Sequence, residues 1–331
     1  MGRDGNFCET YLITGAAGYI GSMLVKELLK RKNKLKIVAC VRNVTAAKNI
    51  FPAEVMIINS DITSGKFVDE ILSSVENIDY IIHTASPTES KFMVTNPVET
   101  VEAIVSGTRN VLELARRAKV KSMIYLSSME VYGQVNDIGR ARNEAELGTI
   151  DLQSPRSSYP LGKRLAEHYC YLYCQEYEVP VKIARLAQTF GRGVRLTDNR
   201  VYMQFARAVV NETDIILRTQ GKSLGNYCSI DDVLSAVLLL LKEGTDGEVY
   251  NVVNEQNTMT IREMAELVAG DLAGGKIKVK VEEMDSSKTG YPPDTGLRLS
   301  SEKLQELGWR ANISLRQMYE DVITEIKNKK N

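Results

Sequence analysis

The chain has 331 residues, enough to bury a large core in one or two domains. Its 42 basic and 42 acidic side chains give a formal net charge of zero, so no overall field attracts nucleic acid or an anionic membrane. No apolar run approaches the ~20 residues of a membrane helix, and the N-terminal residues form no apolar signal region. Five cysteines without paired CxxC spacing and only two histidines predict neither disulfides nor a metal site. We therefore expect a cytoplasmic protein that binds neither nucleic acid nor a membrane.

Short apolar runs alternate with helical patterns through the first part of the chain. The helical patterns occupy residues 23–30, 98–118 and 158–177. This alternation predicts parallel strands joined by crossover helices, an α/β fold with a doubly wound parallel Rossmann sheet. The runs expected as buried strands are 11–13, 36–41, 55–58, 80–82, 123–126 and 181–184.

After about residue 189 the alternation loosens, and glycines and the Pro292-Pro293 pair divide the chain into shorter elements. The run 248–253 is expected to return as a further strand. We predict a dinucleotide-binding Rossmann domain of residues 1–188 plus about 226–254. A smaller, interleaved C-terminal substrate domain is expected over residues 189–225 plus about 255–331.

A glycine-rich loop links the first strand to the first helix. Gly15, Gly18 and Gly21 allow a tight turn and a close approach of the backbone to a pyrophosphate at the helix N-terminus. The alternative is a tight turn without a ligand. The strand before the loop and the helix after it favour dinucleotide binding.

The ends of the second and third strands carry further candidates. Where an acidic residue would bind a ribose 2′-hydroxyl, the chain has Arg42, which suits a 2′-phosphate and favours NADP over NAD. The alternative is a solvated arginine at a strand tip. Asp61 either accepts from the adenine amino group or caps the helix expected near Gly65.

A hydroxyl and a carboxylate follow the strand at 123–126. Ser128 and Glu130 lie where the carboxyl ends of parallel strands face a ligand crevice. The alternatives are a serine that bonds the backbone of a turn and an exposed turn carboxylate.

Tyr159 and Lys163 lie four residues apart, on one face of the predicted helix. An ammonium beside a phenol favours the phenolate and lowers its pKa from about 10, so the pair can act as a general base. In isolation this spacing is more typical of a solvated helical pair. Its position after a dinucleotide loop and Ser128 favours catalysis.

Taken together, these motifs resemble the extended short-chain dehydrogenase/reductase family of nucleotide-sugar epimerases, dehydratases and decarboxylases, over nearly the whole chain. Within it, segments 162–167 and 184–191 are most similar to UDP-glucuronate decarboxylases. The segments that carry the resemblance are the glycine loop, Asp61-Ile62, His83-Thr84-Ala85, 107–112, 128–133, 159–163 and Leu307-Gly308-Trp309.

The resemblance implies roles for individual residues. Tyr159 would take a proton from a sugar hydroxyl, Lys163 would bind the nicotinamide ribose, and Ser128 would hydrogen-bond the reacting oxygen. Hydride would pass between carbon 4 of the sugar and the nicotinamide, giving a 4-keto intermediate. The expected cofactor residues are Gly15, Ala17, Gly18, Tyr19, Ile20, Gly21, Arg42, Asp61, Ile62, Thr84, Ala85, Ser86, Tyr159 and Lys163.

Glu130 bears on the net reaction. Relatives that eliminate water carry an acid and a base directly after the catalytic hydroxyl, and here these positions are Met129 and Glu130. A dehydratase of the usual design is disfavoured, whereas decarboxylases keep the glutamate alone. An epimerase or an NADPH-dependent 4-keto-sugar reductase needs neither residue.

Other departures concern the substrate. Ile104 replaces a family asparagine, Gly225 replaces an arginine that grips the diphosphate, and Gln188 replaces another asparagine. The residues expected to bind the nucleotide sugar are Ser86, Gln188, Arg192, Arg195 and Arg200, with Arg218, Lys222 and Arg298 as further candidates.

The resemblance also implies a homodimer formed through the helices at 98–118 and 158–177. Their apolar stripes, which equally suit packing on the protein's own sheet, include Leu112, Ala115, Tyr169, Leu172 and Tyr173. We expect an enzyme that binds NADP or NAD and a nucleotide-diphosphate sugar. The alternative from another class is an NADP-sensing regulatory protein, which retention of Ser128, Tyr159 and Lys163 disfavours.

Overall fold

The computed structural model describes residues 9–31, 35–135, 139–282 and 296–329. Cys8 and the Pro292-Pro293 pair lie outside these ranges. Within them, every helix is too short or too polar to cross a membrane.

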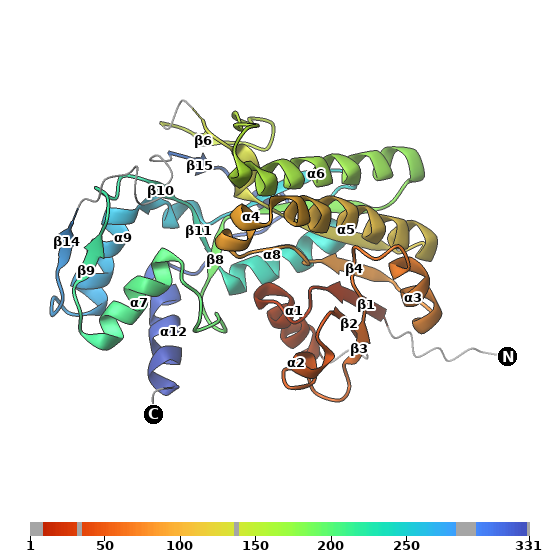
Figure 1. The fold of residues 1–331 in the computed structure, drawn as a ribbon, viewed down its shortest axis with the longest axis horizontal. Helices are drawn as coiled ribbons and strands as arrows, with labels where there is room; N and C mark the ends of the chain where they lie inside the picture. Colours follow the sequence, from red (N-terminus) through yellow and green to blue (C-terminus); the bar gives the residue numbers. More distant parts are fainter. Residues whose placement is uncertain (1–8, 32–34, 136–138, 283–295, 330–331) are drawn as a thin grey trace. The chain divides into compact units, whose positions relative to one another are not determined.

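Seven parallel strands form the central sheet, in the order β12-β7-β5-β4-β1-β2-β3. Four of them, β4, β1, β2 and β3, are labelled in Figure 1. In the register of the sheet, Leu12 on β1 lies between Val38 on β2 and Ile81 on β4. The order reverses beside β1, so the sheet is doubly wound and its switch point lies at the carboxyl ends of β1 and β4. The predicted sheet and its return strand are confirmed. Its strands are β1 (Glu9–Thr14), β2 (Leu35–Val41), β3 (Met56–Asn59), β4 (Tyr80–His83), β5 (Ser122–Ser128), β7 (Val181–Leu186) and β12 (Val249–Val252).

The predicted long helices are also present, and α5 packs along α6 (Figure 1). Pro97 lies in the first turn of α5, where its missing N–H costs no hydrogen bond, and Lys119 ends the helix in the left-handed conformation. The helices among the first six strands are α1 (Tyr19–Leu29), α2 (Val44–Lys48), α3 (Phe67–Ser74), α4 (Ser90–Thr95), α5 (Pro97–Ala118) and α6 (Ser158–Tyr177).

The main core lies between one face of the sheet and helices α3, α5 and α6. Alternate strand residues such as Met123 and Tyr125 belong to this core, together with Val111 of α5 and Cys170 of α6. The residue between them, Ile124, is also fully buried. Both faces of the sheet are therefore covered, as expected for parallel strands.

The chain forms two compact units that exchange segments. Unit 1 contains residues 1–133, 150–185 and 234–250, and unit 2 contains 134–149, 186–233 and 251–331. Residues 134–149, 186–188, 226–233 and 251–254, which we assigned to the first domain, thus lie in unit 2. The assignment of cofactor and substrate to separate domains stays a prediction.

Unit 2 has an aromatic centre in which the ring of Phe190 stacks on Tyr202 at 4.2 Å and meets Tyr319 edge-on at 5.3 Å. Short elements surround it, as the loosened alternation predicted. The remaining helices and strands are β6 (Ala141–Arg142), β8 (Gln188–Phe190), α7 (Val201–Asn211), β9 (Ile215–Leu217), β10 (Leu224–Gly225), β11 (Tyr227–Ser229), α8 (Ile230–Glu243), β13 (Met259–Thr260), α9 (Ile261–Leu267), β14 (Val279–Val281), β15 (Arg298–Leu299), α11 (Glu302–Glu306) and α12 (Leu315–Asn328).

Candidate active site

The glycine loop forms a tight cradle at the N-terminus of α1. Gly15 has a φ of +65°, and its carbonyl accepts from the Gly18 amide at 2.8 Å. A Cβ at Gly21 would collide with the Gly15 carbonyl, so only glycine fits there. Gly18 supplies no side-chain cap and the first turn has no acidic residue, which leaves the positive end of the helix suited to an anion. Ala17 lies in the turn, and Tyr19 and Ile20 begin the helix.

The segment after β4 packs against this cradle. The Thr84 hydroxyl donates to the Thr14 carbonyl at 2.7 Å, and a Cβ on Gly15 would lie 2.7 Å from the Ala85 backbone. The ring of His83 joins the Thr14 hydroxyl at 2.7 Å to the Thr108 hydroxyl at 3.2 Å. Burial lowers the pKa of His83 to about 3, so this bridge is neutral at physiological pH. His83 appeared in the sequence only as part of a motif, and its bridging position required the fold.

The tips of β2 and β3 hold the residues expected near the adenosine. Arg42 is exposed after β2, and its neighbour Asn43 caps α2 by accepting from the Ala46 amide at 2.9 Å. Asp61 accepts from both the amide and the hydroxyl of Thr63, at 2.9 and 2.8 Å. It therefore caps its own turn, while α3 begins later, with Lys66 at its N-cap.

Asn110 on α5 holds the loop that carries Asp61. Its side-chain amide donates to the Ile62 carbonyl at 2.8 Å, and the Ile62 side chain fills the space beside Gly107. This explains why a glycine and an amide belong to the same helical motif. The motif therefore fixes the position of the loop that we expect to bind the cofactor.

Ser128 is the last residue of β5 and the N-cap of a 3₁₀ turn, Met129–Tyr132. Its hydroxyl accepts from the Glu130 amide at 3.2 Å. The alternative of a serine that bonds the backbone of a turn is therefore correct. The same hydroxyl also interacts with the Tyr159 phenol. Ser128 is therefore oriented by the turn toward the predicted base.

Tyr159 is 8% exposed and has the hydroxyls of Ser128 and Ser86 beside its phenol. Burial, followed by the negative charge of Glu130, raises the pKa of Tyr159 above its ordinary value, although Ser128 opposes this. Our expectation that the protein itself lowers the pKa of this phenol is therefore wrong. Burial of the phenol outweighs the groups that favour its ionised form.

Lys163 is buried beneath Tyr159, 2% exposed. Its Nζ donates to the Leu126 carbonyl at 2.8 Å and lies 4.7 Å from the centre of the Tyr125 ring and 5.8 Å from that of Tyr159. Burial lowers the pKa of Lys163 to about 7, against the opposing charge of Glu167. The predicted pair is thus close in space, but the lysine is poised to lose its proton near neutral pH.

Glu130 faces Arg156, whose Nη2 lies 3.5 Å from both carboxylate oxygens. The side chains keep 38% and 46% of their surface exposed, respectively. Desolvation by surrounding protein atoms raises the pKa of Glu130, and the charge of Arg156 opposes the shift. The sequence analysis did not identify Arg156, because it lies 26 residues after Glu130 and only the tertiary fold brings the two side chains together.

Within the described residues, the buried hydroxyl of Ser86 has no hydrogen bond of good geometry, although it lies beside the Tyr159 phenol. Because a buried hydroxyl is normally paired, this one is available to a bound molecule next to Tyr159. It was predicted from the resemblance alone.

The predicted substrate residues of unit 2 include arginines that already form ion pairs with carboxylates of the same unit. Arg192 is held by the carboxylate of Asp231, with its Nε 2.8 Å from Oδ1, and Arg200 pairs with Asp198. Arg195 is exposed on the same loop, and Gln188 opens β8. Arg192 and Arg200 are thus already paired with carboxylates within the unit. Among the further candidates, Arg218 pairs with Glu282, while Lys222 and Arg298 are exposed.

Two departures from the family pattern have packing reasons. Ile104 is 1% exposed, and a Cβ on Gly162 would lie 3.4 Å from its side chain, so it fills the contact between α5 and α6. At Gly225, any Cβ would collide with the phenol of Tyr227, so a side chain cannot be accommodated. An arginine at this position would have to displace a buried tyrosine.

A family model described as the NAD dependent epimerase/dehydratase family matches residues 11–253. The chain belongs to this family. UDP-glucuronic acid decarboxylase 3 of Arabidopsis thaliana is 28% identical over 324 residues, covering 95% of this chain and 89% of the relative. The dTDP-D-glucose 4,6-dehydratase of Bos taurus is 26% identical over 324 residues, covering 95% and 87%. The solved UDP-glucose 4-epimerase of Thermus thermophilus, in complex with NAD, has a TM-score of 0.80 and 24% identity, covering 96% of this chain and 99% of that one.

These similarities confirm the resemblance and the fold class. The protein is therefore an enzyme of the extended short-chain dehydrogenase/reductase type. Its family is NAD-dependent and contains nucleotide-sugar epimerases, dehydratases and decarboxylases. The preference for NADP and the individual site residues stay predictions. In the described part of the chain, no group of three or more His, Cys, Asp or Glu side chains could hold a metal.

Proposed function

We propose that this epimerase/dehydratase family enzyme acts on a nucleotide-diphosphate sugar through transient oxidation at carbon 4. The observation that carries the proposal is the buried Tyr159 phenol, which has the hydroxyls of Ser128 and Ser86 beside it and Lys163 below it. A hydroxyl of the substrate placed among these groups can lose its proton and keep hydrogen bonds throughout. This is the requirement for interconverting a hydroxyl and a carbonyl.

The cradle fits the cofactor of the family. A pyrophosphate needs close backbone approach at an uncapped helix N-terminus, which Gly15, Gly18 and Gly21 provide. Asp61 and Ile62 would hold the adenosine, and Thr84 and Ala85 the central part of the molecule. When bound, NAD supplies the acceptor for the electron pair removed from carbon 4.

Side chains of the protein would then transfer the proton of the sugar hydroxyl. Because its pKa is raised, Tyr159 would accept the proton of the sugar hydroxyl only as it gives up its own proton toward Lys163, while Ser128 and Ser86 hydrogen-bond the same oxygen and balance its changing charge. Lys163, with a pKa near 7, is able to receive or replace the proton from below.

A specific observation favours decarboxylation of a uronate as the net reaction. Glu130 has a raised pKa and a loose pair with Arg156, and Met129 stands where a dehydratase would carry an acid. The supporting relative is a UDP-glucuronic acid decarboxylase. Epimerisation and 4-keto reduction remain the alternatives, because they use the same Tyr159, Lys163 and Ser128.

We further propose that unit 2 binds the nucleotide diphosphate, and that two copies pair through α5 and α6. Leu112 and Ala115, which we expected to contribute to such a pairing, are buried inside the protomer. Leu172, which we also expected there, is exposed, as are Leu165 and Tyr171 of the same helix α6. These three side chains form the apolar surface that a second copy would cover.

Mass spectrometry of the products tests the function. The protein is incubated with UDP-, dTDP-, GDP- and CDP-sugars, including UDP-glucuronate, with and without NADPH. Loss of carbon dioxide supports decarboxylation and an isomer of unchanged mass supports epimerisation. For any sugar of the panel that carries a 4-keto group, a gain of two hydrogens supports reduction. Tyr159→Phe should abolish turnover, whereas Tyr177→Phe, an exposed change on the same helix, should not. Unchanged turnover by Tyr159→Phe would refute the mechanism.

A further inference from the structure

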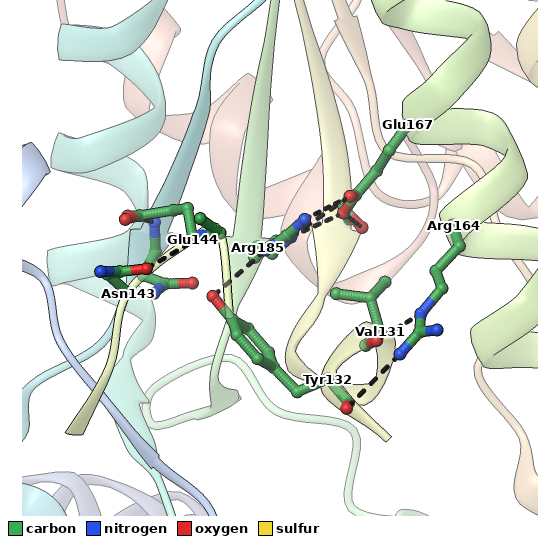
Figure 2. Close-up of polar contacts among 10 residues, drawn as sticks. Val131, Tyr132, Asn143, Glu144, Arg164, Glu167 and Arg185 are labelled. Carbon is green, nitrogen blue, oxygen red and sulfur yellow. Dashed lines mark hydrogen bonds and ion pairs between the residues drawn. The ribbon is translucent and has the colours of Figure 1, made fainter. Parts of the chain in front are cut away.

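A buried ionic cluster lies directly behind the turn that carries Glu130. Arg185 of β7 is clamped on Glu167 of α6, with its Nε 3.0 Å from Oε1 and its Nη2 2.7 Å from Oε2. Their side chains are only 4% and 8% exposed. Figure 2 shows Arg185 between Glu167 and the phenol of Tyr132, to which its Nη1 donates at 3.2 Å.

A second arginine grips the backbone of the same turn. Arg164 donates from Nε to the Val131 carbonyl at 2.7 Å and from Nη2 to the Tyr132 carbonyl at 3.5 Å (Figure 2). Both carbonyls belong to the 3₁₀ turn Met129–Tyr132, which follows Ser128 directly. The end of the turn is therefore held by its side chain and by its main chain.

The beginning of the turn is tied to the same cluster. The Ser127 hydroxyl donates to Oε1 of Glu167 at 2.5 Å, whereas its neighbour Ser128 interacts with Tyr159. Both partners lie on α6, so one serine ties the strand end to this helix while the other contacts the phenol near the start of the same helix. Glu167 also lies four residues after Lys163 on α6, the helix that carries Tyr159. One rigid helix therefore carries Glu167, which holds the turn, together with the proposed base and its lysine.

Stability alone does not account for such an arrangement. Replacing a buried ion pair by apolar side chains of similar size is often neutral or stabilising, because desolvation offsets the attraction between the charges. The cluster instead fixes the orientation of the turn. Hydrogen bonds to planar guanidinium and carboxylate groups are directional, and here they hold both ends of the turn. The turn carries the two side chains that must face the substrate.

We propose that Glu167, Arg185 and Arg164 are positioning residues that fix Ser128 and Glu130 relative to Tyr159 and Lys163. The inference rests on the proposed function for its catalytic consequence. Its structural consequence can be measured without any substrate. A misplacement of about 1 Å at a catalytic group is able to cost about 10²-fold in rate, so loosening the turn should be visible in kcat.

The test uses the double variant Glu167→Gln/Arg185→Met, which removes both members of the ion pair together, so that neither is left without the other. Amide hydrogen exchange of residues 127–133 is measured by mass spectrometry, beside thermal unfolding and NAD binding. We expect an unchanged Tm and NAD affinity, with exchange of this segment at least about tenfold faster. Arg164→Met should accelerate exchange in the same way, and Arg164→Lys should partly restore protection because it keeps one donor.

Arg117→Met is the matched control, since it removes an exposed ion pair with Asp69 elsewhere in unit 1. On whichever nucleotide sugar the wild type converts, kcat should fall roughly 10²-fold in the double variant with KM unchanged. A folded double variant with wild-type exchange in 127–133 would overturn the inference. If no sugar of the panel is converted by the wild type, the proposed function fails while the exchange result still decides the positioning role.

Discussion

The Nζ atom of Lys163 lies 4.7 Å from the centre of the Tyr125 ring and donates to the Leu126 carbonyl. Both contacts come from β5, and together they hold an ammonium in a space closed to water. The ring face and the carbonyl only partly replace the lost hydration, which is why burial lowers the pKa of Lys163 to about 7.

This burial predicts a pH dependence of stability. The folded pKa is lower than the unfolded one, so between about 7 and 10.5 the unfolded chain binds more protons at this site. Lys163 therefore penalises folding at low pH, and the penalty decreases as the pH rises through this window. Relative to Lys163→Met, the wild type should gain up to about 1.4 kcal/mol of unfolding free energy per pH unit. Urea unfolding of both proteins between pH 6.5 and 9.5 measures this gain in unfolding free energy. Parallel curves of unfolding free energy against pH would contradict the prediction.

The cradle predicts a defined effect of one methyl group. Gly21→Ala places a Cβ against the Gly15 carbonyl, and such overpacking costs about 1–3 kcal/mol. Both the Tm and the NAD affinity measured by calorimetry should fall. The control is Gly270→Ala, a helical position with open space around it, where the change should be neutral or stabilising. Equal behaviour of the two variants would count against the cradle.

Arg42 predicts a difference between the two cofactors. If its exposed guanidinium binds a 2′-phosphate, Arg42→Ala should weaken NADP binding about tenfold or more and leave NAD binding unchanged. Lys48→Ala, at the end of the neighbouring α2, serves as a charge-matched control. Calorimetric titration with each cofactor measures the difference. Equal loss of both cofactors, or loss of neither, would refute the proposed preference.

The pair of Glu130 and Arg156 predicts a shift in the pH profile of the reaction. Arg156 opposes the raised pKa of Glu130, so Arg156→Met should raise the pKa of that carboxyl further. If Glu130 is a base, the acid limb of kcat against pH should move to higher pH, and Glu130→Gln should lower kcat by about 10² or more. Glu113→Gln, on the outer surface of α5, should change neither. An unmoved limb in Arg156→Met would exclude Glu130 as the group that sets it.

The exposed side chains on α6 predict the oligomeric state. Leu172→Glu places a charge in the surface that we propose to be shared by two copies, and should convert a dimer to a monomer in light-scattering measurements. Leu152→Glu changes an equally apolar and even more exposed side chain outside α6, and should leave the mass unchanged. A wild-type monomer, or a Leu172→Glu dimer, would show that another surface or none is used.

Much of the fold was predictable because its signals are local. The strands at 11–13 and 123–126 are short apolar runs between helical patterns, and a glycine at Gly15 or Gly21 marks a backbone that admits no side chain. Periodicity and glycine placement are read within a few residues. They predicted the doubly wound sheet, the position of the cradle and the proximity of Tyr159 to Lys163.

What the tertiary structure decided is the electrostatic state of the site. The pKa of Tyr159 is raised rather than lowered, and that of Lys163 falls to about 7, because segments distant in the sequence exclude water from both. Arg185 and Glu167 come from a strand and a helix, and no local pattern reveals that they meet. Desolvation and charge pairing depend on every atom packed around a group, so they follow only from the folded chain.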